Sequence, residues 1–156
     1  MSESAAVQEQ AQNEDLKLQI SRTIKASRKR VFDSWTRPEL MQRWFAPATM
    51  RVSNATADLR VGGEYRVEIH GVDGYVHVAA GVYTRIIPNE LLSFTWGAGC
   101  EPGVDTLVTV QLRDVDGGTE LTLTHEHFAS SQAVAKHQQG WIGCLDKLDK
   151  LESMES

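Results

Sequence analysis

The sequence predicts an α+β fold in which one curved antiparallel sheet of about seven strands wraps around a long C-terminal helix, with two short helices after the first strand. Seven short segments carry strand signals, and short turns join the last six, so consecutive strands should pair antiparallel. Residues 130–153 instead repeat apolar side chains at helical spacing, and the pattern offers this one long helix to cover the sheet.

Length and composition indicate one soluble domain. The chain has 156 residues, of which 41% are hydrophobic, enough for one proper core but not for two. Residues 1–15 are polar, acidic and rich in glutamine, so we expect a disordered tail before a single domain over residues 16–152. The net charge is −5, and no long basic run is present to neutralise phosphates, so nucleic-acid binding is disfavoured.

The sequence also limits the cellular compartments in which we expect the protein. No apolar run approaches the roughly 20 residues that cross a bilayer, and the N-terminus lacks the apolar segment of a signal peptide. Cys100 and Cys144 lie far apart and match no metal spacing. Two thiols without a secretion signal are typical of a reducing compartment. We therefore expect a cytoplasmic protein without a membrane span, either a monomer or a homodimer.

The first strand and the two helices after it are predicted from a change in the spacing of apolar side chains. Residues 16–24 alternate as a half-buried strand, whereas residues 26–47 repeat apolar side chains at helical spacing. Ser27 is a fair N-cap for the first helix. Pro38 disfavours helical geometry at Arg37 and permits a second helix to begin.

Strand signals dominate the middle of the chain. The connections between them contain glycine, proline, asparagine and aspartate, which favour tight turns. Small residues in the fourth strand, "VAAG", suggest a bend, a bulge or a closely packed backbone. The predicted strands cover residues 50–58, 63–70, 75–87, 91–97, 105–113 and 119–128.

The last helix should hold the sheet through one apolar stripe. Val134, Trp141, Leu145 and Leu148 recur at helical spacing, and Ser130 or Ser131 can cap its start. Two interior glycines each cost about 1 kcal/mol relative to alanine, which suggests either a close approach of helix and sheet or space beside the helix. A strongly twisted sheet that curls around one helix leaves a cavity wherever side chains fail to fill it. The glycines are Gly140 and Gly143.

Five stretches in this order resemble one family. The resemblance runs from about Leu16 to Leu151 and is to the SRPBCC superfamily, also called START-like or helix-grip, and within it to the homologues of the heat-shock-chaperone ATPase activator. It implies the helix-grip fold with a cavity under the C-terminal helix. It implies no single function, since members include lipid and polyketide binders, aromatic cyclases and chaperone co-factors. The stretches are "VFDSWTRPELMQRWFAP", "DLRVGGEYR", "PNELLSFTW", "GGTELTLTHEHF" and "GWIGCLDKL".

The stretch "LTLTHEHF" places imidazoles at the end of an apolar strand face. Leu121, Leu123, His125 and His127 share one parity. A metal site would need further ligands, which no spacing in the chain selects. His125 is otherwise a hydrogen-bonded interior residue with His127 near solvent, or it is the polar group of an apolar pocket. We predict no metal and no cofactor.

Aromatic residues either form an ordinary core or line a cavity that accepts a flat or greasy ligand. Phe94 and Trp96 share parity with Leu92 and should face inward. The face of Tyr83 stays open, because a bulge near Gly81 would switch it. The predicted ligand-binding residues are Trp44, Tyr65, Phe94, Trp96, His125 and Trp141.

These features favour a binder of a small apolar or aromatic ligand over an enzyme. No G-x-S-x-G motif occurs, and neither cysteine sits in a catalytic context, so no catalytic residue is predicted. A cyclase or hydrolase that uses His125 or a buried acid in the same cavity is one alternative. A chaperone co-factor is another, although dedicated co-chaperones of this type usually carry an additional domain, for which we expect no room.

Overall fold

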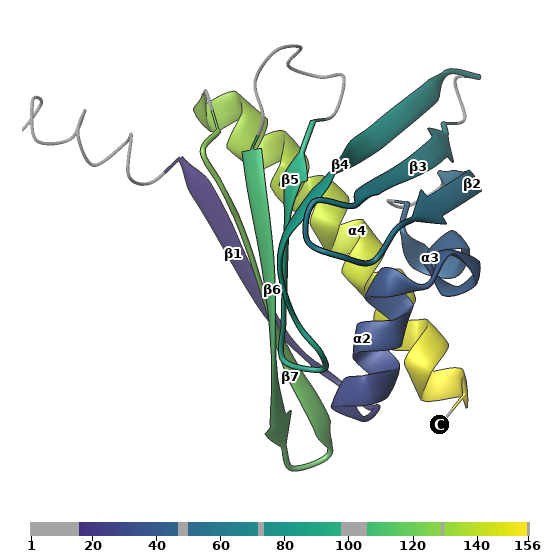
Figure 1. Cartoon of the computed structure of the whole chain (residues 1–156), viewed down its shortest axis with the longest axis vertical. Helices are drawn as coiled ribbons and strands as arrows, with labels where there is room; N and C mark the ends of the chain where they lie inside the picture. Colours follow the sequence, from purple (N-terminus) through teal and green to yellow (C-terminus); the bar gives the residue numbers. More distant parts are fainter. Residues whose placement is uncertain (1–15, 47–49, 72–73, 98–105, 129, 156) are drawn as a thin grey trace, which may run out of the picture.

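The chain folds as a single antiparallel sheet with one long helix running obliquely across a face of it (Figure 1). The computed structural model describes residues 16–46, 50–71, 74–97, 106–128 and 130–155. The strands lie in the order β1-β7-β6-β5-β4-β3-β2, and every neighbouring pair is antiparallel. The predicted α+β class, the sheet and the covering helix are therefore confirmed.

The observed elements follow the predicted order, and strand ends differ by about two residues at most. The disordered tail that the sequence predicts over residues 1–15 lies outside the described part of the chain. The helices are α2 (Arg28–Thr36), α3 (Pro38–Trp44) and α4 (Ser131–Glu155). The strands are β1 (Lys17–Ile24), β2 (Arg51–Ala57), β3 (Glu64–His70), β4 (Val76–Ile87), β5 (Leu91–Trp96), β6 (Thr106–Val115) and β7 (Gly118–Glu126).

Local chemistry starts each helix where the sequence predicts. The Ser27 hydroxyl accepts a hydrogen bond from the Arg30 backbone N–H at 3.2 Å and so satisfies one free amide of α2. Pro38 occupies the first turn of α3, where its missing N–H is harmless. Of the two serines proposed to cap α4, Ser130 accepts from the Ala133 backbone N–H at 3.1 Å.

Strand β4 lies between β3 and β5 and pairs with each of them over a different part of its length. Its first half, from Val76 to Val82, pairs with β3, whereas the residues from Tyr83 onward pair with β5. The bulge that sequence analysis expects near Gly81 lies between Tyr83 and Arg85, and it turns Tyr83 into the core. Gly81 serves the close approach instead, because a Cβ there would lie 2.0 Å from the carbonyl oxygen of Thr95.

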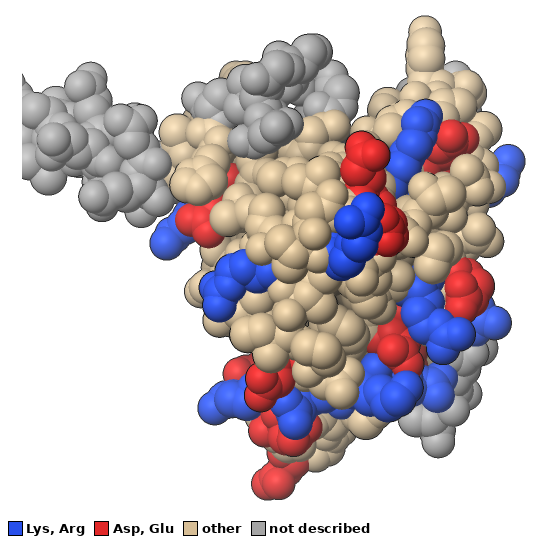
Figure 2. Space-filling model, in the orientation of Figure 1, with Lys and Arg blue, Asp and Glu red and all other residues tan. Residues whose placement is uncertain are grey.

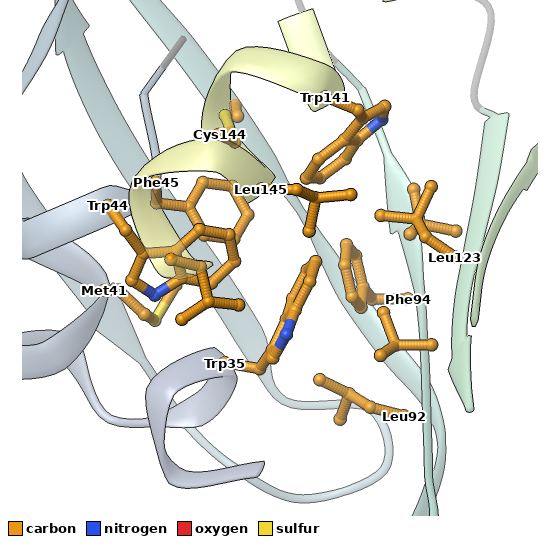
Figure 3. Packing of buried hydrophobic residues seen from close by; sticks show 14 of the residues in the cluster. Trp35, Met41, Trp44, Phe45, Leu92, Phe94, Leu123, Trp141, Cys144 and Leu145 are labelled. Carbon is orange, nitrogen blue, oxygen red and sulfur yellow. The ribbon is translucent and has the colours of Figure 1, made fainter. Parts of the chain in front are cut away.

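The core lies between the sheet and α4 and is rich in aromatic rings. Figure 3 shows Trp35 from α2 among Leu92, Phe94 and Leu145, with Trp141 of α4 close by. Trp35 packs edge-on against Trp44, with ring centroids 4.6 Å apart. Rings in this arrangement add to the stability that burial alone provides, so this cluster fixes α4 against the two short helices.

Charged side chains of both signs intermingle on the face seen in Figure 2, without a continuous basic stripe. None of the described helices is long and apolar enough to cross a membrane. Among the described residues, one acid is buried: Glu152 of α4 is 1% exposed, and its Oε2 lies 2.6 Å from the Arg30 Nε of α2. This pair ties the end of α4 to α2.

Candidate ligand-binding site

An apolar cavity of about 690 Å³ lies between α4 and the part of the sheet formed by β3, β4 and β5. It opens where β4 runs with β3, beyond the end of β5 at Trp96. The residues of β4 from Val76 to Ala79 therefore line the cavity beyond the point where β5 ends. The lining residues are Phe45, Met50, Ile69, Tyr75, Val76, His77, Val78, Ala79, Trp96, Lys136, His137, Gly140, Trp141 and Cys144.

The helix wall of this cavity is a stripe on α4 at intervals of four residues. Lys136, Gly140 and Cys144 follow one another along it, and His137 and Trp141 lie beside them. A Cβ built on Gly140 meets no atom within 4 Å. The expectation that Gly140 lets the helix approach the sheet is therefore wrong, and the expectation of space beside the helix is confirmed.

Three of the aromatic rings in the wall pack against one another. Trp96 of β5 and Trp141 of α4 lie with ring centroids 5.1 Å apart, and Phe45 lies 6.1 Å from Trp96 in a stacked arrangement and 5.7 Å from Trp141. Each ring comes from a different segment, so the wall exists only in the folded chain. Such a surface can pack against a flat or greasy molecule.

His125 lies in the core behind this aromatic wall and is hydrogen-bonded to it. The Trp141 Nε1 donates to His125 Nδ1 at 3.0 Å, so Nδ1 is the acceptor and the proton sits on Nε2. Nε2 donates to the Thr106 hydroxyl at 2.6 Å, and that hydroxyl donates to the Trp96 carbonyl at 3.0 Å. Burial, with a smaller contribution from nearby His137, lowers the pKa of His125 from 6.5 to about 3. His125 is therefore neutral and linked to both tryptophans.

The second imidazole of the same stretch points elsewhere. Strand β7 ends at Glu126, and His127 has a positive φ of 73°, which turns its side chain to solvent. The expectation that His125 and His127 share one face is therefore wrong. Within the described ranges, no three side chains of the metal-binding types gather to hold an ion.

A second hollow lies beside α2 and α3, and its lining is charged. Lys29 lies 3.0 Å from Asp33, and Arg30 lies 2.6 Å from Glu152, so the charges in it already pair with one another. The apolar cavity is the better candidate for a ligand site.

A family model for "Activator of Hsp90 ATPase homolog 1-like protein" matches residues 25–152 of the chain. The chain belongs to this family. The match covers most of the sequence, including α2, α3 and most of α4, which confirms the resemblance on which sequence analysis relied. No curated protein matches the chain.

Solved structures of similar shape support the same assignment of fold. A protein from Nitrosomonas europaea is 24% identical, with a TM-score of 0.78 over 90% of this chain and 96% of its own. The AHSA1 protein from Silicibacter pomeroyi is 21% identical, with a TM-score of 0.79 over 90% and 99%. An AHSA1-like protein from Aeromonas hydrophila, determined in solution, is 27% identical, with a TM-score of 0.74 over 86% and 90%.

In this AHSA1-like chain, the six predicted ligand-binding residues belong to one connected group of rings. Trp141 contacts Trp35 and Trp96, and Trp96 contacts His125. Trp35 in turn contacts Trp44 and Phe94, and Phe94 contacts Tyr65. Only two of the six line the cavity, namely Trp96 and Trp141, and the other four are buried in the core around it: Trp44, Tyr65, Phe94 and His125.

Sequence analysis missed most of the AHSA1-like cavity wall. The strand residues from Tyr75 to Ala79 are part of it because β4 continues beyond the end of β5, which no local pattern indicates. Of the helix residues, sequence analysis named Trp141 as a ligand contact and Gly140 as a sign of space or close approach, but it did not name Lys136 or Cys144 as part of the wall. Lys136, Gly140 and Cys144 share a helical stripe next to Trp141, and an interior glycine on that stripe is a sign of space.

Proposed function

We propose that this protein binds a small apolar or aromatic molecule in the cavity between α4 and the sheet. The observation that carries the proposal is the Trp96–Trp141 pair, with ring centroids 5.1 Å apart, in the wall of a cavity of about 690 Å³. That volume is within the usual range of about 300–1,000 Å³ for small-molecule sites. The ligand would contact Trp96 and Trp141, while Trp44, Tyr65, Phe94 and His125 would support these rings from the core.

The geometry disfavours the catalytic roles that sequence analysis considered for His125 and for a buried acid. A proton-transfer enzyme needs a titratable group that reaches its substrate. Both His125 nitrogens are hydrogen-bonded to protein groups, and His125 is 0% exposed. Glu152 pairs with Arg30 and lies outside the cavity lining. The family's description suggests a chaperone-activating role, but that role would need a protein-binding surface, and the proposal rests on the cavity.

Titration with the neutral fluorophore N-phenyl-1-naphthylamine tests the proposal, with Gly140 as the position that is changed. In Gly140→Leu, the new side chain should occupy the open space beside α4 and weaken fluorophore binding at least about tenfold. Gly140→Ala is the matched control: it should retain binding and stabilise the fold by about 1 kcal/mol, since alanine is the better helix former. The melting temperature of each variant establishes that it is folded.

Two results would overturn the proposal. One is a wild-type protein that does not bind the fluorophore. The other is a folded Gly140→Leu variant that binds it as tightly as Gly140→Ala does, because the fluorophore would then occupy some other surface.

A further inference from the structure

We propose that the ligand is an amphipathic anion whose apolar body lies in the cavity and whose carboxylate meets Lys136 at the rim. This inference rests on the proposed function and specifies the class of molecule. It is carried by the charges of the described lining residues, which are of one sign, although the chain as a whole has a net charge of −5.

The first observation is the absence of acids around the cavity. Among the described residues that line it, Lys136 is positive, and neither aspartate nor glutamate is present. An anion placed there would meet no like charge among these described residues. A cation would face Lys136 without a compensating carboxylate, so the lining selects against it.

The second observation is that Lys136 has no acidic neighbour along α4. Residues three and four positions away are the natural partners of a helical lysine, and here they are Gln132, Ala133, Gln139 and Gly140. Lys136 forms no ion pair within the part of the chain that the structure describes.

The second half of α4 differs. It contains Asp146, Asp149 and Glu152. Lys150 follows Asp146 at the favourable interval of four residues, and the Lys147 Nζ donates to the Met50 carbonyl oxygen at 2.7 Å. These acidic residues of α4 thus lie away from the cavity, and none of them is a helical neighbour of Lys136 at the cavity rim.

The third observation is that Lys136 and a carboxylate fit one another as donor and acceptor. A lysine ammonium can only donate hydrogen bonds, whereas a carboxylate only accepts them. Lys136 lines the cavity, so its charge and its hydrogen-bonding capacity are complementary to the proposed head group.

A matched pair of ligands separates this inference from the proposed function. Decanoate and 1-decanol have the same chain length and differ in the head group, and each is tested by displacement of bound N-phenyl-1-naphthylamine. In Lys136→Gln, decanoate should bind about three- to tenfold more weakly, as expected for the loss of one charge-assisted contact at a partly exposed site. 1-Decanol and the fluorophore should bind within about twofold of wild type.

Lys150→Gln is the control, because it removes the same charge from an exposed position on α4 outside the lining. It should leave decanoate binding unchanged. If the fluorophore and 1-decanol bind but Lys136→Gln alters decanoate no more than Lys150→Gln does, the anion inference is overturned and the cavity remains a binding site. If wild type binds none of the three compounds, the proposed function itself is overturned.

Discussion

Acidification from pH 7 to pH 5 should destabilise the fold through His125. In the folded chain, burial holds the pKa of His125 at about 3, whereas an unfolded chain would titrate at the ordinary value of 6.5. Between these two values the unfolded state binds a proton that the folded state does not, so stability falls as pH falls. The stabilising contribution is fully present above pH 6.5 and is lost progressively toward pH 3.

The magnitude follows from the linkage of proton binding to folding. Each pH unit between the two pKa values is worth about 1.4 kcal/mol, so His125 should remove about 2 kcal/mol at pH 5 relative to pH 7. For a domain of this size, that corresponds to a fall in melting temperature of about 4–8 °C.

Urea denaturation of wild type and His125→Gln at pH 5, 6 and 7 measures this effect. Glutamine does not titrate, and its amide can accept from Trp141 Nε1 and donate to the Thr106 hydroxyl. The variant should be less stable than wild type at pH 7 but should lose much less stability toward pH 5. Equal losses in the two proteins would refute the reasoning, because the pH dependence would then come from other groups.

Three further substitutions test the packing of α4, the last of them as a control. Trp141→Ala should lower the unfolding free energy by about 3–5 kcal/mol, because the ring is 3% exposed and its removal also leaves His125 Nδ1 without a donor; an unchanged urea midpoint would mean that α4 does not dock through this ring. Arg30→Ala should cost about 1–3 kcal/mol because it leaves the buried Glu152 carboxylate without its charged partner. As a control, Arg22→Ala removes the surface ion pair of Arg22 with Asp146, an exposed residue of α4, and should lower the unfolding free energy by less than about 1 kcal/mol. Equal effects of Arg30→Ala and Arg22→Ala would show that the burial of Glu152 adds nothing to its ion pair.

The fold could be predicted from the sequence because each helix and strand has a recognisable pattern in its own residues. Alternation of period two along β7 specifies which side chains face inward, and Leu121, Leu123 and His125 are indeed buried. Ser27 and Pro38 mark the starts of the helices by their own chemistry. Such signals depend on neighbours a few residues away, so one sequence is enough to read them.

The site was harder to predict because it depends on where elements separate. The wall from Tyr75 to Ala79 lies where β4 continues beyond the end of β5, and this arrangement arises from pairing between distant segments. His127 leaves the strand face through a single positive φ, which period alone does not reveal. Lys136 resembles any solvated lysine until the cavity beside it is known.

The central claim, that a ligand occupies the cavity beside Trp96 and Trp141, can be tested by NMR on the indole N–H signals of the four tryptophans. Each side chain gives one signal, and decanoate is titrated into ¹⁵N-labelled protein. We expect the Trp96 and Trp141 signals to shift with saturation, while the Trp44 signal, whose Nε1 donates to the Ser34 carbonyl at 2.9 Å in the core, stays in place. Saturable shifts of Trp44 with none at Trp96 and Trp141, or no saturable shift at any tryptophan, would contradict the account.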